Sequence, residues 1–452
     1  MSKDKMKSLL IVTQTDVQQA GNQVLFRTMQ GYVNAGYKVV LLTSGLKSDP
    51  NRADYAELFG STIDDVAIYR FSPLFSFLYQ PLLKVIRRIK GSLLARPSVQ
   101  VERLQIGMAN TLPSLFATST NPVLGMFSWI LTTLGGISKA IRMARRYNVR
   151  LVYGYGTYGV PIAWFVAKIQ RIPLVTKFQG TVVFPEMQRG KAWLRIPHYL
   201  MALKIPTDLV IMGNDGTRGK EVLLRMGVAE KKIRFWMDGV RKDIYLPQFD
   251  RRALLGKLGI NGETKLIITL SKLKNWKRVD RTIQVMPQVL KGIPNAFLVI
   301  VGDGSERENL EELARTLKVD DHVIFVGAVP HDEVNDFLNG GDLFLSLYDH
   351  SNLCNPVQEA LECGKCIISV DDGSTSELLS NGYNAMLIRK ETLIEELPRT
   401  IITLLLDDKK RQQLARNARQ SAQKHLLSWE DRMALEVTEV ERVLLTKGET
   451  GK

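Results

Sequence analysis

The segment Ser351–Gly364 joins a polar loop to a helix whose first turn suits an anion. It reads Ser-Asn-Leu-Cys-Asn-Pro-Val-Gln-Glu-Ala-Leu-Glu-Cys-Gly and follows an apolar run. Asn355 is a favourable N-cap, Pro356 suits the first helical turn, and Gly364 suits the left-handed position after a helix. The free N–H groups and positive dipole end of such a helix favour an anion such as a diphosphate. Glu359 lies one turn further along, within reach of ribose hydroxyls. The alternative interpretation is an ordinary, well-capped unit of strand and helix.

Strands and helices alternate along the whole chain and must position this segment. In the first half we expect strands at Ser8–Thr13, Lys38–Thr43, Leu151–Tyr153, Leu174–Phe178 and Leu209–Met212, with helices at Gln23–Ala35 and Pro161–Gln170. In the second half we expect strands at Leu266–Leu270, Ala296–Val301, Val323–Val326, Leu343–Leu347 and Cys366–Val370, with helices at Val279–Lys291 and Glu306–Leu317. Strands that alternate with helices form parallel sheets covered on both faces, so the expected fold class is α/β with doubly wound domains.

Two domains are expected from the length and from a turn-rich linker. The chain has 452 residues, which is long for one hydrophobic core. Asp238–Phe249 is rich in turn residues, and the pattern of strands and helices restarts after it. We therefore expect one domain over residues 1–245 and another over residues 262–428. Residues 429–452 contain a long helix, Trp429–Leu445, whose domain the sequence does not identify.

The composition fits a globular protein of a reducing compartment. Three cysteines in so long a chain argue against a disulfide framework. Cys363 and Cys366 form a Cys-x-x-Cys pair without a second pair nearby, so no zinc or redox site is expected. The chain shows no signal-peptide-like apolar core and no run of about twenty apolar residues. We therefore expect a cytoplasmic protein.

The net charge of +15 belongs to the first half of the chain. Residues 1–250 carry 34 Lys and Arg against 16 Asp and Glu, a balance of +18; residues 251–452 carry 27 against 30, a balance of −3. A basic surface attracts anionic lipid, a charged glycan precursor or nucleic acid. The sequence contains no recognisable nucleic-acid-binding module, so we expect no nucleic acid partner.

Residues 71–138 interrupt the alternation of strands and helices. Two apolar-aromatic stretches, Phe71–Leu83 and Val123–Leu131, occur in this insertion, and a cluster of basic residues follows the first of them. Apolar stretches beside basic clusters suit a helix that lies in a membrane interface, here the inner face of the cytoplasmic membrane. The alternative is a helical insertion that packs on the first domain with its basic face in solvent.

Six short motifs follow one another along the chain: Gly21, Asp238-Gly-Val240, Ser271–Asp280, Val301-Gly-Asp-Gly304, Phe325-Val-Gly327 and Ser351–Glu359. In kind and order they resemble the motifs of the retaining glycosyltransferases of family 4. The chain resembles that family over nearly all of residues 8–430, and most closely over residues 265–390. The resemblance implies the GT-B fold, in which two Rossmann-like domains face a central cleft.

The resemblance also implies a reaction. A sugar would pass from a nucleotide-diphosphate donor, of the UDP or GDP type, to a glycan or lipid-linked acceptor in the synthesis of cell-surface polysaccharide. The configuration at the sugar would be retained. No metal ion and no cofactor besides the donor substrate are implied.

Individual residues receive roles from the same resemblance. Lys272 and Lys277 follow the strand that ends at Leu270, and they would stabilise the departing diphosphate. Glu359 would bind the ribose. The remaining expected donor-binding residues are Gly21, Asn22, Gln179, Gly327, Val329, Ser351, Asn352, Leu353 and Asn355.

The sequence departs from the family pattern in two places. Ser351 stands eight residues before Glu359, where the family typically carries the first acid of a Glu-x7-Glu pair. Tyr153-Gly-Tyr155 and Phe178–Thr181 stand where family members often carry histidines. These departures favour the alternative of a non-catalytic scaffold of a glycan-assembly complex. An epimerase acting on nucleotide sugars is a further alternative, and the absent first acid counts against it.

Overall fold

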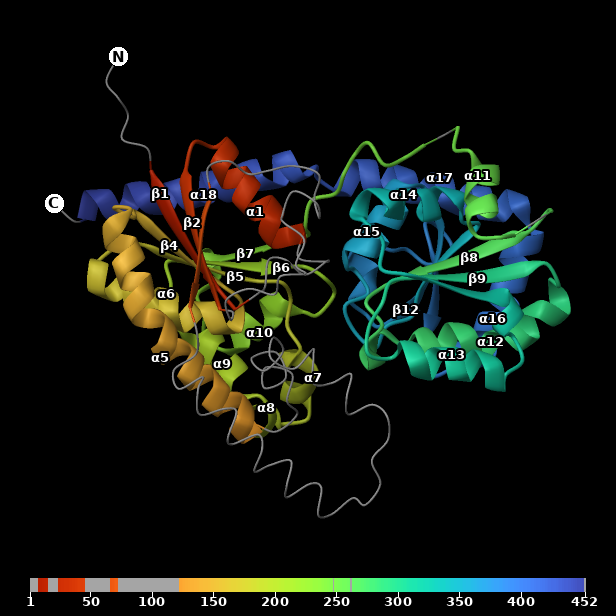
Figure 1. The fold of residues 1–452 in the computed structure, drawn as a ribbon, viewed down its shortest axis with the longest axis horizontal. Helices are drawn as coiled ribbons and strands as arrows, with labels where there is room; N and C mark the ends of the chain where they lie inside the picture. The colour runs from red at the N-terminus through yellow and green to blue at the C-terminus, as the bar shows by residue number, and fades with distance from the viewer. Residues whose placement is uncertain are drawn as a thin grey trace. The chain divides into compact units, whose positions relative to one another are not determined.

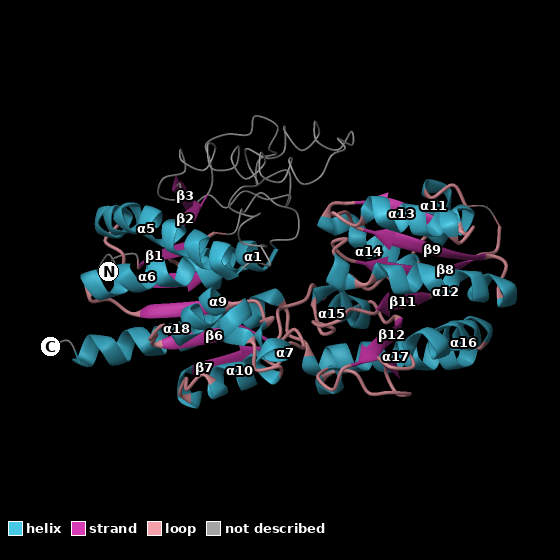
Figure 2. Cartoon of the chain, turned by 90° about the horizontal axis from the view of Figure 1, so that it is seen from below, coloured by secondary structure: helices cyan, strands magenta, loops and turns pink. Residues whose placement is uncertain are grey.

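The computed structural model describes residues 7–14, 23–44, 66–71, 122–246, 248–260 and 262–450. It divides into two compact units (Figure 1). Unit 1 comprises Met1–Gly213, Gly219–Trp236 and Met433–Lys452, and unit 2 comprises Asn214–Arg218 and Met237–Arg432. In each unit, helices cover both faces of a parallel sheet (Figure 2), which confirms the predicted α/β class with two Rossmann-like domains.

Unit 1 contains a seven-stranded sheet in the order β3-β2-β1-β4-β5-β6-β7, and every pair of neighbours is parallel. The strands are β1 (Ser8–Thr13), β2 (Lys38–Ser44), β3 (Val66–Phe71), β4 (Leu151–Tyr155), β5 (Leu174–Phe178), β6 (Leu209–Gly213) and β7 (Ile233–Trp236). The helices include α1 (Gln23–Asn34), α5 (Pro122–Arg146), α6 (Gly156–Gln170), α7 (Val183–Gln188), α8 (Ala192–Arg195), α9 (Pro197–Lys204) and α10 (Gly219–Arg225).

The central strand of unit 1 is buried on both faces. Leu9 and Ile11 of β1 pack in one hydrophobic core, and Leu10 and Val12 pack in the other. Successive side chains of a strand point to opposite faces, so a continuous apolar run fits a strand with helices on both sides. This is why the apolar run Ser8–Thr13 could be recognised as a strand.

Helix α18 (Trp429–Thr450) starts in unit 2 and continues into unit 1, with the boundary between Arg432 and Met433. Met433 belongs to the same core as Tyr32 of α1 and the strand residues beneath it. A Cβ atom added to Gly31 would lie 2.6 Å from Cγ of Met433, so α1 and α18 pack closely where this glycine lies (Figure 1).

The start of α6 was predicted wrongly. The helix begins at Gly156 rather than at Pro161, and Pro161 lies inside it. A proline inside a helix leaves the carbonyl four residues earlier without its usual donor. Here that carbonyl belongs to Thr157, and it accepts a hydrogen bond from the Trp129 indole N–H at 2.9 Å. The compensating donor comes from another helix, so no local pattern could reveal it.

Unit 2 contains a six-stranded parallel sheet in the order β10-β9-β8-β11-β12-β13. The strands are β8 (Lys265–Leu270), β9 (Ala296–Val301), β10 (Val323–Gly327), β11 (Leu343–Ser346), β12 (Cys366–Asp371) and β13 (Met386–Arg389). The helices are α11 (Arg251–Lys257), α12 (Val279–Gly292), α13 (Arg307–Thr316), α14 (His331–Gly340), α15 (Asn355–Glu362), α16 (Leu393–Leu406) and α17 (Asp408–His425).

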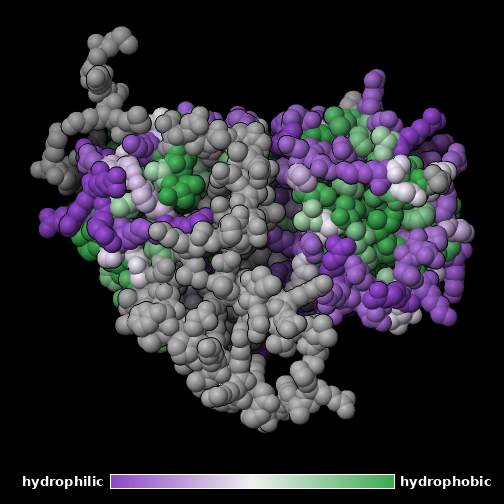
Figure 3. Space-filling view, viewed as in Figure 1, coloured by the Kyte–Doolittle hydropathy of each residue, from purple (hydrophilic) through white to green (hydrophobic). Residues whose placement is uncertain are grey.

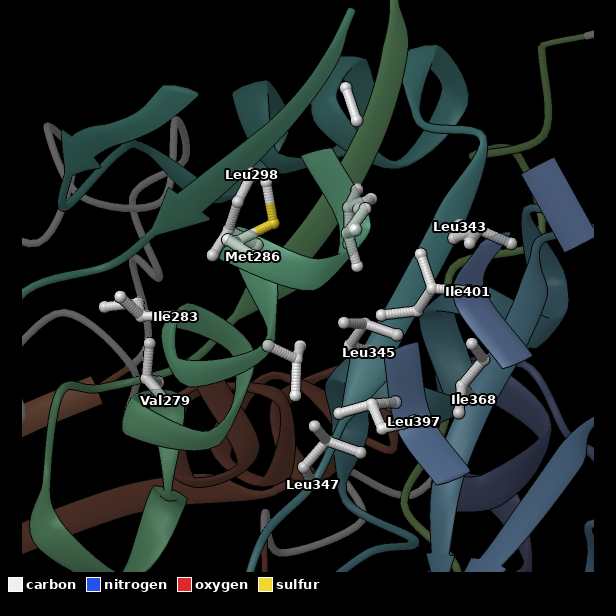
Figure 4. Packing of buried hydrophobic residues seen from close by; sticks show 14 of the residues in the cluster. Val279, Ile283, Met286, Leu298, Leu343, Leu345, Leu347, Ile368, Leu397 and Ile401 are labelled. Carbon is white, nitrogen blue, oxygen red and sulfur yellow. The ribbon is translucent and has the colours of Figure 1, made fainter. Parts of the chain in front are cut away.

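Side chains of the sheet and of two helices form one core of unit 2 (Figure 4). Ile283 and Met286 of α12, and Leu397 and Ile401 of α16, pack against strand residues such as Leu345. In the view of Figure 3, hydrophilic side chains predominate along the rim of unit 2, with hydrophobic ones between them. Such a mixture is usual, because polar groups never cover a whole globular surface.

The strand order of unit 2 reverses between β8 and β11. The chain proceeds outward from β8 through β9 to β10, and then returns to place β11 on the other side of β8. Open α/β sheets bind ligands outside the carboxyl ends of the two strands at such a point. The loops after β8 and β11 are therefore the first place to look for a functional site.

Candidate functional site

The loops after β8 and β11 are fastened to each other. The Tyr348 hydroxyl donates to the carbonyl of Leu270 at 2.8 Å, and the Asp349 N–H donates to the carbonyl of Trp276 at 3.0 Å. The Arg281 guanidinium donates to the carboxylate of Asp349 at 2.7 Å. These contacts bring the Lys272–Lys277 segment and the Ser351–Asn355 segment, both predicted from sequence, to the same edge of the sheet.

Lys277 has its ammonium group between two aromatic rings. Its Nζ atom lies 4.2 Å from the ring centroid of Trp276 and 3.8 Å from that of Tyr348. Burial lowers the pKa of this ammonium, and the nearby Cys354 thiol and Asp215 carboxylate raise it. Within the described part of the chain, no carboxylate forms a salt bridge with Lys277. The aromatic faces hold the cation in place and leave its N–H donors for an anion.

Lys272 lies two residues after the end of β8 and is exposed. It is close enough to Lys274 and Lys277 for like-charge repulsion to act among the three ammonium groups. An anion bound beside them would relieve that repulsion. Lys272 and Lys277 make the carboxyl end of β8 the positive side of the site.

Helix α15 supplies the second half of the anion site. Its N-cap residue is Cys354, not Asn355 as the sequence predicted, and the Cys354 side chain makes no cap hydrogen bond; Asn355 is the first helical residue. The prediction placed Asn355 before a helix that began at Pro356. Proline fits the second helical position as well as the first, because neither position needs its N–H for an intrahelical bond. The predicted end is confirmed: Gly364 follows the helix with φ of +59°.

Glu359 lies on the inner side of α15 and is 7% exposed. Burial raises the pKa of its carboxyl to about 8, and the positive charge of Arg241 opposes this shift. Its Oε1 atom lies 3.6 Å from Nε2 of His331, at the start of α14. A carboxyl with this pKa can carry a proton at neutral pH, so it can both donate to and accept from the hydroxyl groups of a ligand.

Two of the residues predicted to bind the donor, Asn352 and Leu353, have buried side chains that contact other parts of the protein. The Asn352 amide is fully buried; it accepts from the Tyr348 N–H at 3.1 Å and donates to the Asp372 carboxylate at 3.0 Å. Leu353 has its side chain in the hydrophobic core. These two residues shape the loop, and the polar groups of the Asn352 side chain already have partners within the protein.

Ser351 is buried and turned toward a residue that sequence reasoning missed. Its φ is +66°, and its hydroxyl donates to Oδ2 of Asp215 at 2.7 Å. The main-chain carbonyl of Asp215 accepts from the Leu353 N–H at 3.0 Å. Asp215 lies in the short stretch Asn214–Arg218 that clusters with unit 2. No pattern in the sequence connects it with a loop more than a hundred residues later.

The other predicted residues occupy three kinds of position. Gly327 ends β10 with φ of +85°, and its carbonyl accepts from the Gly302 N–H at 2.8 Å; Val329 packs at the edge of the core two residues later. Gln179 belongs to unit 1, where it is exposed at the carboxyl end of β5. Gly21 and Asn22 lie outside the described residues.

The cysteines and carboxylates of the described residues do not form a recognisable metal centre. No group of three or more His, Cys, Asp or Glu residues able to hold a metal ion occurs among them. Cys363 and Cys366 are buried, and burial raises the pKa of each thiol to about 12. Thiols with such pKa values stay protonated at neutral pH and are poor metal ligands.

Known proteins resemble this chain in sequence. The family model described as "Glycosyl transferases group 1" matches residues 250–421. Sulfoquinovosyl transferase SQD2 of Arabidopsis thaliana is 23% identical over 267 residues, which cover 58% of this chain and 50% of that protein. The N-acetyl-alpha-D-glucosaminyl L-malate synthase of Bacillus anthracis is 23% identical over 313 residues, which cover 63% and 72%. With several relatives, including SQD2, the match spans about half of the relative's length or less.

Known structures resemble it over almost the whole chain. Sucrose-phosphate synthase from Thermosynechococcus elongatus superposes with a TM-score of 0.70 at 18% identity, covering 98% of this chain and 100% of that one. The Anabaena protein HepE, in complex with UDP-glucose, superposes with a TM-score of 0.68 at 16% identity, covering 96% and 99%. These similarities show a shared fold, that of the GT-B glycosyltransferases. The chain thus has a GT-B fold, and its residues 250–421 match the family model of the glycosyl transferases group 1.

Proposed function

We propose that this protein is a retaining glycosyltransferase of family 4 that needs no metal ion. It moves a sugar from a nucleotide-diphosphate donor to a glycan or lipid-linked acceptor in the synthesis of cell-surface polysaccharide or glycolipid. The observation that carries the proposal is the ammonium group of Lys277, held between Trp276 and Tyr348 close to the N-cap residue of α15. Two positive elements, a lysine and a helix N-terminus, converge there.

The proposed chemistry follows from where charge develops. As the bond between the sugar and the diphosphate breaks, negative charge grows on the departing phosphate oxygen. Lys277 and the first N–H groups of α15 interact more strongly with that charge than with the intact donor, which lowers the barrier. The acceptor oxygen bonds to the sugar on the face that the diphosphate leaves, and its proton passes to a phosphate oxygen. No protein base is required, and Glu359 is left to bind the ribose.

The names of similar proteins support a nucleotide sugar as donor but leave the base open. HepE structures contain UDP, UDP-glucose, or UDP with glucose. A Mycolicibacterium smegmatis relative, 26% identical over 179 residues, is a GDP-mannose-dependent mannosyltransferase that acts on a phosphatidylinositol monomannoside. A Streptococcus pneumoniae relative is named alpha-monoglucosyldiacylglycerol synthase. We therefore propose a donor of the UDP or GDP type and an acceptor carried by a lipid or a glycan.

Thermal unfolding with a panel of nucleotides tests the function. We expect one class of nucleotide sugar, UDP or GDP, to raise the melting temperature, because a ligand at 100 times its Kd adds about 2.7 kcal/mol to the free energy of unfolding. The shift should persist in EDTA, since the proposed site uses a lysine and backbone N–H groups in place of a metal. If no nucleotide diphosphate or nucleotide sugar shifts the melting temperature, the proposal is wrong. Binding without transfer or hydrolysis would instead favour the scaffold.

We also propose that unit 1 associates peripherally with an anionic membrane on the cytoplasmic side. Helix α5, which contains the predicted stretch Val123–Leu131, exposes Val123 (72%), Phe127 (49%), Ile130 (42%) and Leu134 (49%). Their spacing of four, three and four residues puts them on one face of the helix. In α8 the side chains of Trp193 and Leu194 are also exposed, and both α8 and α5 pack against α9.

The length of α5 alone does not identify a membrane-spanning segment. It is the one helix in the described ranges that is long and apolar enough to cross a bilayer, and 44% of its most apolar stretch is buried in the protein. A helix that is buried on one face and apolar on the other fits an interfacial location better than a transmembrane one. Most of the predicted insertion, residues 72–121, lies outside the described residues.

Sedimentation with anionic lipid vesicles tests this association. We expect the protein to pellet with vesicles at low salt, and the bound fraction to fall as salt rises, because screening weakens the attraction between basic side chains and lipid headgroups. The double change Phe127→Ser and Ile130→Ser should lower the bound fraction several-fold. Leu406→Ser removes a leucine of unit 2 that is even more exposed, and it should leave binding unchanged. Absence of pelleting at low salt would contradict the proposal.

A further inference from the structure

A carboxylate from a distant part of the sequence lies in the candidate site. The stretch Asn214–Arg218 follows β6 in the chain, yet it clusters with unit 2. Through it Asp215 reaches the loop that precedes α15, where its carboxylate accepts from the Ser351 hydroxyl at 2.7 Å and its carbonyl accepts from the Leu353 N–H at 3.0 Å. Asp215 thus belongs structurally to the site, although none of the roles assigned above uses it.

The hydrogen bonds of this carboxylate can be counted. One oxygen accepts from the hydroxyl and the N–H of Thr217, at 2.5 and 3.2 Å, and the other accepts from Ser351. An ionised carboxylate offers about four acceptor positions, so one position on the Ser351 side is not used within the described protein. Burial raises the pKa of Asp215 to about 6, and the bonds from Thr217 and Ser351 oppose that rise. At neutral pH the group is therefore mostly ionised.

Asp215 and Lys277 are near each other without forming a salt bridge. The charge of Asp215 raises the pKa of the Lys277 ammonium, so the two groups interact electrostatically, but their N and O atoms are not within ion-pair distance of each other. A half-buried cation and a half-buried anion that do not pair with each other can be bridged by a ligand with acceptors at one end and donors at the other. Phosphate oxygens suit Lys277, and hydroxyl groups suit Asp215.

We infer that Asp215 binds hydroxyl groups of the sugar that is transferred, and that Ser351 and Thr217 hold its carboxylate in place. The inference rests on the proposed function, because in a nucleotide sugar the hydroxyl-bearing ring directly follows the phosphate that Lys277 would bind. It also accounts for Ser351, which stands where the resembling family typically carries an acid: the hydroxyl of this serine bonds to an acid that the chain supplies from elsewhere.

The same contacts would exist if Asp215 only fastened two loops together, so the test must separate binding of the sugar from support of the loop. Calorimetric titration of UDP and of UDP-glucose, and of GDP and GDP-mannose, into the full chain provides that separation. The difference in affinity between a nucleotide sugar and its nucleotide measures the contribution of the sugar to the free energy of binding. A role confined to loop support would change both affinities together.

In the Asp215→Asn variant we expect the affinity for the nucleotide sugar to fall about 10- to 100-fold, the range for losing a hydrogen bond to a charged group. The affinity for the nucleotide alone should stay within about twofold. Adding Ser351→Glu to this variant returns a carboxylate to the same place and should restore most of the loss. The exposed carboxylate of Asp371 offers a matched control, and Asp371→Asn should change neither affinity.

Three outcomes are informative. Selective loss in Asp215→Asn with recovery in the double variant supports the inference. Equal losses for nucleotide and nucleotide sugar, or no loss at all, overturn it while the proposed function stands. If the unaltered chain binds no nucleotide, the proposed function itself fails and the inference falls with it. The melting temperature of each variant without ligand shows that the altered chains are folded.

Discussion

The Lys277→Ala variant is expected to transfer sugar about 10²- to 10³-fold more slowly than the unaltered chain, the range observed when one preorganised donor to a developing negative charge is removed. Lys277 carries its charge between Trp276 and Tyr348, so its position is fixed before the donor arrives. An interaction that strengthens as the diphosphate departs acts on kcat more than on KM. Steady-state kinetics with the donor identified by thermal unfolding would measure both constants.

Two further variants show whether the loss is specific. Lys274→Ala removes an exposed lysine from the same turn and should change kcat less than about twofold. Lys277→Arg keeps the charge but places a larger, planar group between two rings, so an intermediate rate is expected. If Lys277→Ala left kcat unchanged, Lys277 could not be the group that stabilises the leaving diphosphate.

The Glu436→Ala variant is expected to lose about 3–5 kcal/mol of unfolding free energy, the usual effect of removing one partner of a buried ion pair. Glu436 of α18 is 0% exposed and forms a salt bridge of 3.1 Å with Lys177 of β5, whose side chain is 2% exposed. Tyr153 donates a further hydrogen bond to the same carboxylate at 2.5 Å, and Thr28 accepts one from Lys177 at 3.0 Å. Without Glu436, the lysine would lose this carboxylate while its ammonium group stays buried in the sheet–helix core.

Urea unfolding followed by circular dichroism measures this loss. Glu441 lies on the same helix and pairs with Lys7 at the surface, where the two side chains are 41% and 53% exposed. Glu441→Ala should therefore lower the unfolding free energy by about 1 kcal/mol or less. Replacing both buried partners, as Lys177→Met with Glu436→Leu, should recover part of the loss, because an apolar pair needs no counter-charge. Equal effects of the two single glutamate changes would contradict the assignment.

The sequence predicted those strands and helices that are determined by residues close to one another in the chain. The bounds of β1, β5 and β9 match the predicted strands. β1 and β9 are short, mainly apolar runs flanked by polar or turn residues, whereas β5 also contains Thr176 and Lys177. The lysines after β8 and the helix after β11 could be placed together because parallel strands align their carboxyl ends. The pairing of these two segments in the structure follows from that rule.

Features created by contacts between distant residues could not be predicted. Pro161 was taken as a helix start because the donor that compensates for it, Trp129, lies in another helix. Asn352 and Leu353 have polar and apolar side chains typical of a binding loop, and only the fold shows that both point inward. In the sequence nothing distinguishes Asp215 from the other acidic residues, because its hydrogen bond with Ser351 is formed only in the folded protein.

The buried pair of Lys177 and Glu436 has a consequence for the order of synthesis. A ribosome produces Lys177 and the whole of unit 2 before it reaches Glu436, since Met237–Arg432 lie between them in the chain. Until then the first unit holds an ammonium group that the finished sheet would bury, so its native packing cannot be complete. In the described part of the chain, the hydrophobic cores of unit 2 consist of residues between Val240 and Leu426, all of which are made before Glu436. The second domain to be made is therefore the first that can finish folding.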